Sequence, residues 1–375
     1  MIKNTLFKPG HRFSDLLLGW NARENSRQMP WKGEKDPYLI WLSEIILQQT
    51  RVEQGLAYYN RYRSRYPTIT DLAAAPDDEV MKLWEGLGYY SRCRNLLATA
   101  RIVANDFDGR FPETYQEILS LKGIGPYTAA AISSFAFGLP HAVLDGNVFR
   151  VLARIFGVHL PTDSTAGKKF FTALADQLID REDPATYNQA IMDFGAVICK
   201  PAVPLCHKCV FNQHCYAFRE KETDLLPVKE KKTKVRKRWF YYLVIDSGER
   251  TIIRQRNEKG IWQQLYEFPV IETESETPVD EVLLQAEEMG IIQPGTYRPG
   301  AVSVIMKQQL SHQLIMGRFI RLTMNDPSFK QSLNDGRWIN KQDLPTYAFP
   351  RFINQYLEEP STRIIFQDQQ DGSPL

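Results

Sequence analysis

The stretch LKGIGPYTAAAISSFAFGLPHAVLDGNVFR, residues 121–150, decides how the first part of this chain folds. Gly123 and Gly125 predict a tight turn that a residue with a Cβ would strain, and Pro126 suits the first position of the next helix. We therefore expect two helices joined by a glycine hairpin, whose backbone N–H groups bind phosphate without regard to nucleotide sequence. A plain turn remains the alternative, because a Gly-x-Gly pattern alone is weak evidence.

Asp145 lies beyond the hairpin in the segment LDGNV, just before another apolar stretch. A carboxylate near a phosphate-binding hairpin suggests chemistry on a nucleic-acid sugar, because a cationic transition state there needs a negative partner. The sequence thus indicates Asp145 as a candidate catalytic residue.

Glu44 is the second candidate carboxylate. It lies in YLIWLSEIILQQTRVEQGL (38–56), which we expect to form one mostly apolar helix that starts with Asp36 as N-cap and Pro37 in the first turn. Its helical neighbours are largely apolar, which predicts a raised pKa and suits a general acid near neutral pH. An ion pair between Glu44 and an arginine across a helix contact remains the alternative.

Size and composition set the frame for these candidates. At 375 residues the chain is long enough for two domains with separate cores. The formal net charge is only +2, so any nucleic-acid-binding surface must be local. The first residues lack the apolar core of a secretion signal, and no apolar run is long enough to span a membrane. We therefore expect an intracellular protein that is not embedded in a membrane.

The region 71–105 is expected to form two helices joined by the glycine- and tyrosine-rich segment 86–90. With Arg92, Arg94 and Arg101 nearby, this segment is a candidate edge for base stacking and phosphate binding. A glycine helix end followed by core aromatic residues is the alternative. Because strand-like alternation is missing throughout, the first 220 residues are expected to be all-helical.

Four of the five cysteines lie within seventeen residues, as Cys199, Cys206, Cys209 and Cys215. Only the middle two form a Cys-x2-Cys pair, whereas structural zinc sites usually present two such halves. The uneven spacing favours an iron–sulfur cluster, with a structural role preferred over a redox role. His207 and His214 are expected to be bystanders, and Cys93 is expected to be a buried thiol.

A change of composition follows the basic segment Lys221 to Arg238. We expect a solvated linker at 226–238, which can also touch phosphate. Strands are expected at 239–245, 251–256, 311–324 and 336–340, and helices at 279–290 and 350–358. These elements predict an α+β domain at 239–358, with a disordered tail at 359–375.

The hairpin LKGIGPYT, Asp145 in LDGNVxR and the four-cysteine loop together resemble the endonuclease III superfamily of DNA glycosylases. The stretches PWxxxxDPYxxWLSExxLQQT and WEGLGYYSRxRNL and the C-terminal domain are similar to its adenine DNA glycosylase branch. The resemblance covers roughly residues 14–358. It implies an all-α helix–hairpin–helix domain with an iron–sulfur loop at 1–225, followed by a Nudix-like α+β domain at 239–358.

The same resemblance implies an enzyme that flips adenine out of a pair with 8-oxoguanine, or guanine, and hydrolyses its N-glycosidic bond. Glu44 would then protonate the adenine as general acid, and Asp145 would stabilise the oxocarbenium-like sugar electrostatically or through a transient covalent bond. Tyr127 and Asn147 would support these carboxyls, whose pKa values should be pushed apart. Relatives that also cut the strand carry Lys at position 127. Tyr127 therefore implies a monofunctional glycosylase with little or no lyase activity, since Lys122 lies on the wrong side of the hairpin.

The resemblance also assigns residues around the base and the lesion. Arg27, Trp31 and Gln189 match positions of the base pocket. The expected DNA and lesion contacts are Gln49, Thr50, Leu87, Tyr89, Gly123, Gly125, Ser311 and His312. The last two lie in Leu310-Ser311-His312, where the family's loop usually reads Phe-Ser-His, so the aromatic ring of that loop is replaced by Leu310.

The expected cofactor and partner follow from the same source. The four cysteines would hold a [4Fe–4S] cluster, and a monomer would bind double-stranded DNA containing the lesion in the bacterial cytoplasm, at the nucleoid. Nucleotide hydrolysis by the Nudix-like domain is rejected, because Leu283 and Leu284 stand where a Nudix box needs Arg and Glu and too few carboxylates remain for magnesium. Two alternatives are a glycosylase–lyase for oxidised pyrimidines and an iron–sulfur DNA-binding protein without catalysis.

Overall fold

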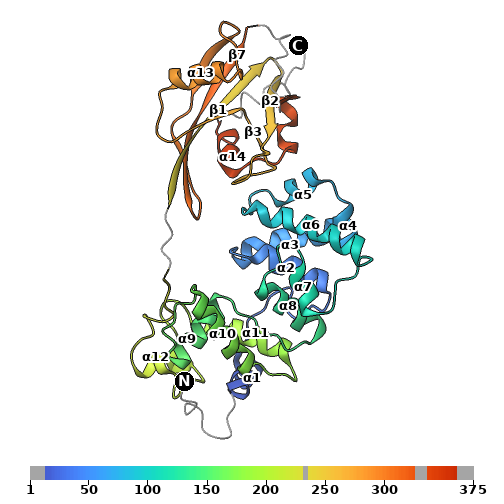
Figure 1. Cartoon of the computed structure of the whole chain (residues 1–375), viewed down its shortest axis with the longest axis vertical. Coiled ribbons are helices and arrows are strands. Elements are labelled where there is room, and N and C mark those ends of the chain that lie inside the picture. Colours follow the sequence, from blue (N-terminus) through green and yellow to red (C-terminus); the bar gives the residue numbers. More distant parts are fainter. Residues whose placement is uncertain (1–12, 231–234, 326–335, 361–375) are drawn as a thin grey trace, which may run out of the picture. The chain divides into compact units, whose positions relative to one another are not determined.

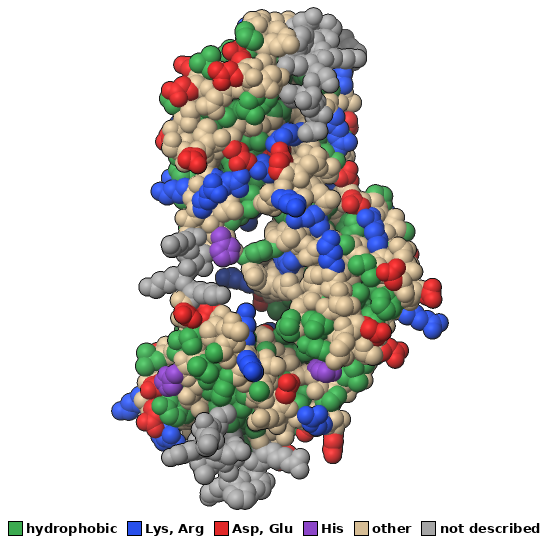
Figure 2. All heavy atoms as spheres, in the orientation of Figure 1, with side chains coloured by type: hydrophobic (Ala, Val, Ile, Leu, Met, Phe, Trp, Pro, Cys, Tyr) green, Lys and Arg blue, Asp and Glu red, His purple; other side chains and the backbone are tan. Residues whose placement is uncertain are grey.

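The computed structural model describes residues 13–230, 235–325 and 336–360 (Figure 1). The chain forms two compact units, one containing the residues up to Ala74 and Asn95–Lys232, the other Ala75–Arg94 and the residues from Thr233 onward. On the face shown in Figure 2, both units carry basic and acidic side chains side by side, in keeping with the net charge of +2. None of the helices in the described ranges combines the length and the apolar character needed to cross a membrane.

The first unit is helical. Its elements are α1 (Phe13–Glu24), α2 (Pro37–Leu47), α3 (Val52–Arg65), α4 (Ile69–Ala74), most of α6 (Tyr90–Asp106), α7 (Tyr115–Ser120), α8 (Pro126–Phe137), α9 (Gly146–Phe156), α10 (Thr165–Leu178), α11 (Pro184–Val197), the 3₁₀ turn η1 (Cys206–Lys208) and α12 (Tyr216–Arg219). Within the described residues no strand occurs before Arg236, so the all-helical prediction is confirmed.

Side-chain caps start many of these helices. Asp36, Thr114, Asp145, Ser164 and Asp183 each accept a hydrogen bond from a backbone N–H in the first turn that follows. Such caps satisfy N–H groups that have no partner inside the helix. The expected helix start at Asp36 and Pro37 is confirmed.

The single helix expected over 38–56 was wrong. Helix α2 ends at Leu47, and α3 begins at Val52 after a break in which Gln49 has a φ of +57°. A left-handed residue cannot continue a right-handed helix, so the break turns residues 48–50 away from the helix axis. The pattern of apolar residues over 38–56 did not indicate this break.

The two helices expected over 71–105 on either side of 86–90 are present as α5 (Asp77–Trp84) and α6, but a further break at Pro76 was missed. The region forms three helices, α4, α5 and α6, and Pro76 is the N-cap of α5. Proline disfavours a helical conformation at the residue before it, so α4 and α5 cannot merge.

The glycine hairpin between α7 and α8 is present, with Pro126 at the start of α8. Gly123 has a φ of +77°, and a Cβ there would lie 2.6 Å from the Asn95 Cβ. Gly125 is different. It is the extended N-cap of α8, with φ −97°, and a Cβ there would meet no atom within 4 Å. The expectation of strain was therefore wrong for Gly125, because its backbone conformation is open to any residue.

A buried asparagine holds the segment that precedes Asp145. Asn188 on α11 is fully buried, its Oδ1 accepts from the Val143 N–H at 3.1 Å, and its Nδ2 donates to the His141 carbonyl at 2.8 Å. Nearby, Trp20 and Phe194 pack edge-on with ring centroids 4.9 Å apart in the core of this unit. Packing in this core and the hydrogen bonds of Asn188 thus hold α11 and the segment that leads into α9, and both contribute to the site described below.

The second unit is built on a mixed sheet with the order β3-β2-β1-β7-β5. The strands β1 (Arg236–Ser247) and β7 (Gln313–Met324) run parallel at its centre, and β2 (Arg250–Gln255) and β4 (Val270–Thr273) are antiparallel to β1. The other strands are β3 (Tyr266–Glu267), β5 (Tyr297–Val302), β6 (Met306–Gln309) and β8 (Gly336–Asn340). Helices α13 (Val279–Glu288) and α14 (Arg351–Leu357) and the 3₁₀ turn η2 (Lys341–Thr346) complete the α+β unit.

All six elements expected in this unit are present, but β3, β4, β5 and β6 were missed. The strand β5 contains Pro299 and Gly300, and β6 has the polar sequence MKQQ, so neither shows apolar alternation. The tail expected at 359–375 lies outside the described residues except for its first two positions.

Several residues of the expected linker 226–238 are held by hydrogen bonds to their own unit or belong to a strand. The Val228 carbonyl accepts from the Thr162 N–H at 3.0 Å, and the Glu230 N–H donates to Asp163 at 2.9 Å. At the other end Arg236 begins β1 and Arg238 forms an ion pair with Glu272. Residues 231–234 lie outside the described residues.

Helix α5 belongs to the second unit, which the sequence did not suggest. The Tyr266 hydroxyl donates to Asp78 at 2.9 Å, and Glu85 accepts from the Phe349 N–H at 2.8 Å. These side chains tie α5 to β3 and to the start of α14.

Candidate active site

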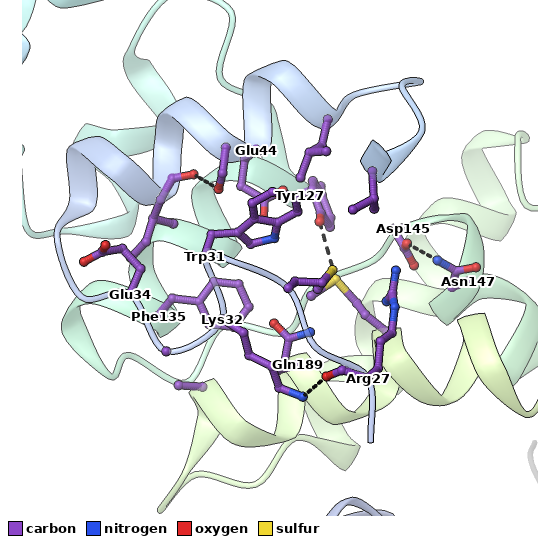
Figure 3. Close-up of a pocket in the computed structure, with 18 of the residues that line it drawn as sticks. Arg27, Trp31, Lys32, Glu34, Glu44, Tyr127, Phe135, Asp145, Asn147 and Gln189 are labelled. Atoms are coloured by element: carbon purple, nitrogen blue, oxygen red, sulfur yellow. Dashed lines mark hydrogen bonds between the residues drawn. The ribbon is translucent and has the colours of Figure 1, made fainter. Parts of the chain in front are cut away.

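A cavity of about 790 Å³ lies in the first unit between α2, α8, α11 and the start of α9 (Figure 3). The break after α2 and the loop before α2 form other parts of its wall. The expected site residues that line it are Arg27, Trp31, Glu44, Gln49, Thr50, Tyr127, Asp145, Asn147 and Gln189. The folded chain therefore brings together both candidate carboxyls and all three residues expected at the base.

Glu44 lies on α2 at the cavity wall, partly buried between apolar helix neighbours. Burial raises the pKa of Glu44 to about 7, a hydrogen bond from Tyr127 acts in the opposite direction, and the charge of Asp145 adds to the rise. No ion pair of Glu44 with a basic residue occurs in the part of the chain that the structure describes, so the arginine alternative is not supported. The raised pKa of Glu44 favours the protonated carboxyl far more than an ordinary glutamate pKa would at neutral pH.

Asp145 is the N-cap of α9 and faces a different environment. Its Oδ1 accepts from the Val148 N–H at 2.7 Å, and its Oδ2 accepts from the Asn147 amide at 2.7 Å. Burial raises the pKa of Asp145, whereas these two hydrogen bonds and the Arg150 charge lower it. The N–H groups at the helix start also favour the ionised form. More groups thus stabilise the anion at Asp145 than at Glu44.

Arg150 anchors the Asn147 side chain. Its guanidinium donates to the Asn147 Oδ1 and the Gly195 carbonyl, each at 2.8 Å, and to the Cys199 carbonyl at 2.8 Å. Arg150 is only 7% exposed, so this geometry is fixed by packing as well as hydrogen bonds. Asn147 is therefore held with its amide nitrogen toward Asp145.

Tyr127 projects from α8 into the cavity, and its hydroxyl lies 3.4 Å from the Met192 sulfur (Figure 3). Burial and the two nearby carboxyls raise the pKa of Tyr127 well above its ordinary value, so the phenol stays protonated and acts as a hydrogen-bond donor. Lys122 is exposed and does not line the cavity.

The sequence reasoning missed Lys32 and Asp193. Lys32 lines the cavity, and Asp193 is a fully buried carboxylate on α11 that accepts a hydrogen bond from it. An acidic residue four positions after Gln189, within an otherwise apolar stretch of helix, was the available signal.

The four cysteines surround a second, small cavity, together with apolar side chains and Arg154. Arg154 is 2% exposed and donates to the carbonyls of Lys200, Pro201 and Leu226, while its Nη1 lies 3.5 Å from the Cys199 sulfur. Among the described residues no three His, Cys, Asp or Glu side chains converge on a single-ion position. Four thiols around a cavity, rather than around one point, fit a polynuclear cluster.

Two of the four thiols are protonated when no metal is bound. Burial raises the pKa of Cys209 to about 12 and that of Cys215 to about 11. Both sulfurs are thus protonated at neutral pH without metal, and cluster binding must displace those protons. The distant Cys93 is 1% exposed, as expected for a buried thiol.

The expected lesion contacts in the second unit lie on two segments. Leu87 is buried, whereas Tyr89 is 45% exposed and its hydroxyl forms a hydrogen bond with that of Ser311. His312 uses its carbonyl to accept from the Arg236 N–H at 2.9 Å.

The arginine edge suggested near 86–90 does not form as proposed. The Arg92 guanidinium is largely buried against the Trp84 ring, Arg94 donates to the Gln263 carbonyl at 2.7 Å, and Arg101 donates to the Ala73 carbonyl at 3.3 Å. These arginines stabilise the protein's own backbone or rings.

Both units match known protein families. Residues 42–173 match the HhH-GPD superfamily of base excision DNA repair proteins, and residues 240–359 match the NUDIX domain family. The chain is 32% identical over 360 residues to the adenine DNA glycosylase of Buchnera aphidicola subsp. Baizongia pistaciae (strain Bp), a match that covers 94% of this chain and 95% of the relative. The chain belongs to the adenine DNA glycosylase family.

Two further similar proteins are also DNA glycosylases. The adenine DNA glycosylase of Homo sapiens is 40% identical over 223 residues, covering 57% of this chain and 41% of the human protein. A solved structure of a thermostable thymine-DNA glycosylase shares 32% identity with a TM-score of 0.52, over 56% of this chain and 95% of that chain.

As a member of the adenine DNA glycosylase family, the chain is a base excision repair enzyme that hydrolyses N-glycosyl bonds. The expected architecture, a helix–hairpin–helix domain followed by a Nudix-like domain with a mixed sheet, is confirmed. The alternative of a DNA-binding protein without catalysis has no support among these relatives.

Proposed function

We propose that this chain excises adenine paired with 8-oxoguanine, and also adenine paired with guanine, by hydrolysing the N-glycosidic bond without cutting the strand. The observation that carries the proposal is the pair of carboxyls in one cavity, Glu44 with a pKa of about 7 and Asp145 at the start of α9. Cleavage of a glycosidic bond needs one protonated and one ionised carboxyl.

Glu44 acts as the general acid. A carboxyl with a pKa near 7 is protonated often enough at neutral pH and gives up its proton readily. Transfer of this proton to a ring nitrogen turns the adenine base into a good leaving group. Tyr127 lies in the same cavity and acts on Glu44 by lowering the pKa of that carboxyl, while its hydroxyl contacts the Met192 sulfur at 3.4 Å.

Asp145 stabilises the sugar as the bond to the base breaks. Positive charge then develops on the sugar ring, and an ionised carboxylate held beside it lowers the barrier, either electrostatically or through a transient covalent bond. Hydrogen bonds from Asn147 and Val148 fix the carboxylate before the reaction begins. Addition of water to the sugar carbon completes the hydrolysis.

Lyase chemistry requires a neutral amine that can attack the sugar carbon. Position 127, which carries Lys in relatives that cut the strand, is Tyr here. The amino groups of the two lysines that line the cavity are both hydrogen-bonded to protein oxygens. Lys32 donates to Asp193 and to the Arg27 carbonyl, and Lys35 donates to the Phe135 carbonyl at 3.1 Å. A glycosylase without strand cleavage is therefore the proposed activity.

We further propose that Cys199, Cys206, Cys209 and Cys215 hold a [4Fe–4S] cluster. Such a cluster would close the loop between α11 and α12 by joining its two ends, which is a structural contribution rather than a chemical one. The expected test is the iron and sulfide content of the purified protein, with a Cys209→Ser variant as the comparison.

In the same proposal the segments 1–225 and 239–358 are the glycosylase and lesion-recognition domains, with 226–238 as the basic linker between them. The strand that carries 8-oxoguanine is contacted by Gln49, Thr50, Leu87, Tyr89, Ser311 and His312. The phosphate backbone is bound by the backbone N–H groups of the hairpin at Gly123 and Gly125. The protein works as a monomer on double-stranded DNA at the nucleoid.

The test is a single-turnover incubation with a duplex that holds one adenine opposite 8-oxoguanine, analysed with and without alkali. Strand breaks that appear only after alkali treatment are the expected result. Breaks without alkali would contradict the monofunctional assignment. Tight binding with no product under either treatment would contradict the substrate assignment itself.

A further inference from the structure

Asp193 is the most completely enclosed carboxylate next to the cavity. It is fully buried on α11 and accepts hydrogen bonds from four side chains. Arg27 and Gln189 donate to its Oδ1 at 2.8 and 3.0 Å, and Asn25 and Lys32 donate to its Oδ2 at 2.9 and 3.1 Å. Three of these donors, Arg27, Lys32 and Gln189, line the cavity, whereas Asp193 itself lies behind them.

Charge balance accounts for the burial of Asp193. A buried carboxylate is tolerated only when it is paired and hydrogen-bonded, and here Arg27 and Lys32 supply two positive charges. The same carboxylate keeps these two cations from presenting uncompensated charge to a base that gains a proton during the reaction. In all four hydrogen bonds a carboxylate oxygen of Asp193 is the acceptor, because an ionised carboxylate cannot donate.

The consequence falls on Gln189. Its amide has one side that donates and one that accepts, and Asp193 accepts only, so the Nε2 must turn toward Asp193. The Oε1, at the other end of the amide, is then the atom that Gln189 can offer to a ligand in the cavity that its side chain lines (Figure 3). Across the described residues no group donates a hydrogen bond to this oxygen.

A fixed acceptor in the pocket discriminates between bases. A base with an exocyclic amino group donates to it, whereas a base with a carbonyl at that place meets oxygen with oxygen and leaves both unsatisfied. Adenine carries the amino group, and hypoxanthine has the same ring system with a carbonyl instead.

We propose that Asp193 is a specificity-determining positioning residue, which orients the Gln189 amide so that the pocket accepts an amino-bearing purine and rejects a carbonyl-bearing one. This inference rests on the proposed excision of adenine. Asp193 acts through Gln189 and does not touch the base.

The test compares single-turnover rates on two duplexes that differ only in having adenine or hypoxanthine opposite 8-oxoguanine. The ratio of the two rates is measured for the full-length protein and for Asp193→Asn. In this variant the side-chain amide at position 193 can donate to the Gln189 oxygen, which frees the glutamine to turn its NH₂ toward the base. The adenine-to-hypoxanthine ratio should fall by about tenfold or more.

A double-mutant cycle separates this role from a merely structural one. Gln189→Leu removes the amide at nearly constant size, and in that background Asp193→Asn should leave the ratio unchanged. A ratio that stays at the wild-type value in Asp193→Asn, or that falls equally in both backgrounds, would overturn the proposal.

Two controls keep the outcomes distinct. Binding to a duplex with a tetrahydrofuran abasic analogue opposite 8-oxoguanine verifies that each variant is folded, and Asp193→Ser replaces Asp193→Asn if the latter is not. A wild-type protein inactive on adenine would refute the proposed function, whereas an active one with an unchanged ratio in the folded Asp193 variant would refute only this inference.

Discussion

The Arg150 guanidinium donates to the Asn147 Oδ1 at 2.8 Å, and this contact decides which way the Asn147 amide faces. Its other end, the Nδ2, donates to Asp145 at 2.7 Å. Arg150 also donates to the Cys199 carbonyl at 2.8 Å, at the first residue of the cysteine loop. The proposed catalytic carboxylate is therefore supported through two side chains by the backbone of that loop.

Removal of the Asn147 amide should weaken this support. In Asn147→Ala, Asp145 loses one of the hydrogen bonds that lower its pKa, so its pKa rises further. Because the ionised form is the active one, the acid limb of the rate–pH profile should move to higher pH, and the single-turnover rate at pH 7 should fall about 10–100-fold. A uniform loss with an unshifted acid limb would contradict this role.

Titration of Glu44 should produce the basic limb of the rate–pH profile. Burial raises the pKa of Glu44 to about 7, and the acid must be protonated, so the wild-type rate should fall as pH rises through about 7. Glu44→Gln should lose that limb and about 10²–10⁴-fold in rate while still binding DNA. A basic limb that persists in this variant would assign the titration to another group.

Glu44 should also cost stability at high pH. Its pKa in the folded protein is raised from the usual 4.5 to about 7, so the folded state binds the extra proton and stability falls as pH rises between these values. Glu44→Gln should therefore be more stable than the wild type above pH 7, by about 2–3 kcal/mol after partial solvent screening. Denaturant melts at pH 8 and pH 5 check this, since the difference should largely vanish at the lower pH.

The two glycines of the hairpin, Gly123 and Gly125, allow a stability comparison in which one substitution is strained and the other is not. Gly123→Ala must adopt a φ of +77° and place its Cβ 2.6 Å from the Asn95 Cβ, so it should lose about 1–3 kcal/mol of stability. Gly125→Ala faces neither problem and should change stability by less than about 0.5 kcal/mol. Thermal melts of the two variants give the comparison, and equal losses would mean that the hairpin geometry is not the cause.

Arg154 should matter for the cysteine loop. It is 2% exposed and bonds three backbone carbonyls on two segments, which a lysine cannot do from one point. Arg154→Lys should lower stability by about 2–4 kcal/mol and reduce the iron content of the purified protein. Arg219→Lys, at an exposed arginine on the adjacent α12, is the control and should retain both.

Local patterns carried much of the fold. The cap at Asp36, the hairpin before Pro126 and the apolar strands β1, β2 and β7 were all visible, because each depends on residues close together in the chain. The raised pKa of Glu44 was also predicted correctly, since its helix is apolar on several sides. The sequence did not predict the strands β5 and β6, because they are held by pairing with β7 and do not show alternating apolar and polar residues of their own.

The sequence by itself determined the helix start at Asp36, the glycine turn and the clustering of the four cysteines, and it named Glu44 and Asp145 as candidates, because these follow from residue type and short spacing. Only the tertiary structure decided the break after Leu47 and the ordinary backbone of Gly125. It alone brought Arg27 to Asp193, 166 positions away in the chain. A buried carboxylate takes its role from the donors that packing places around it, and no local pattern contains them.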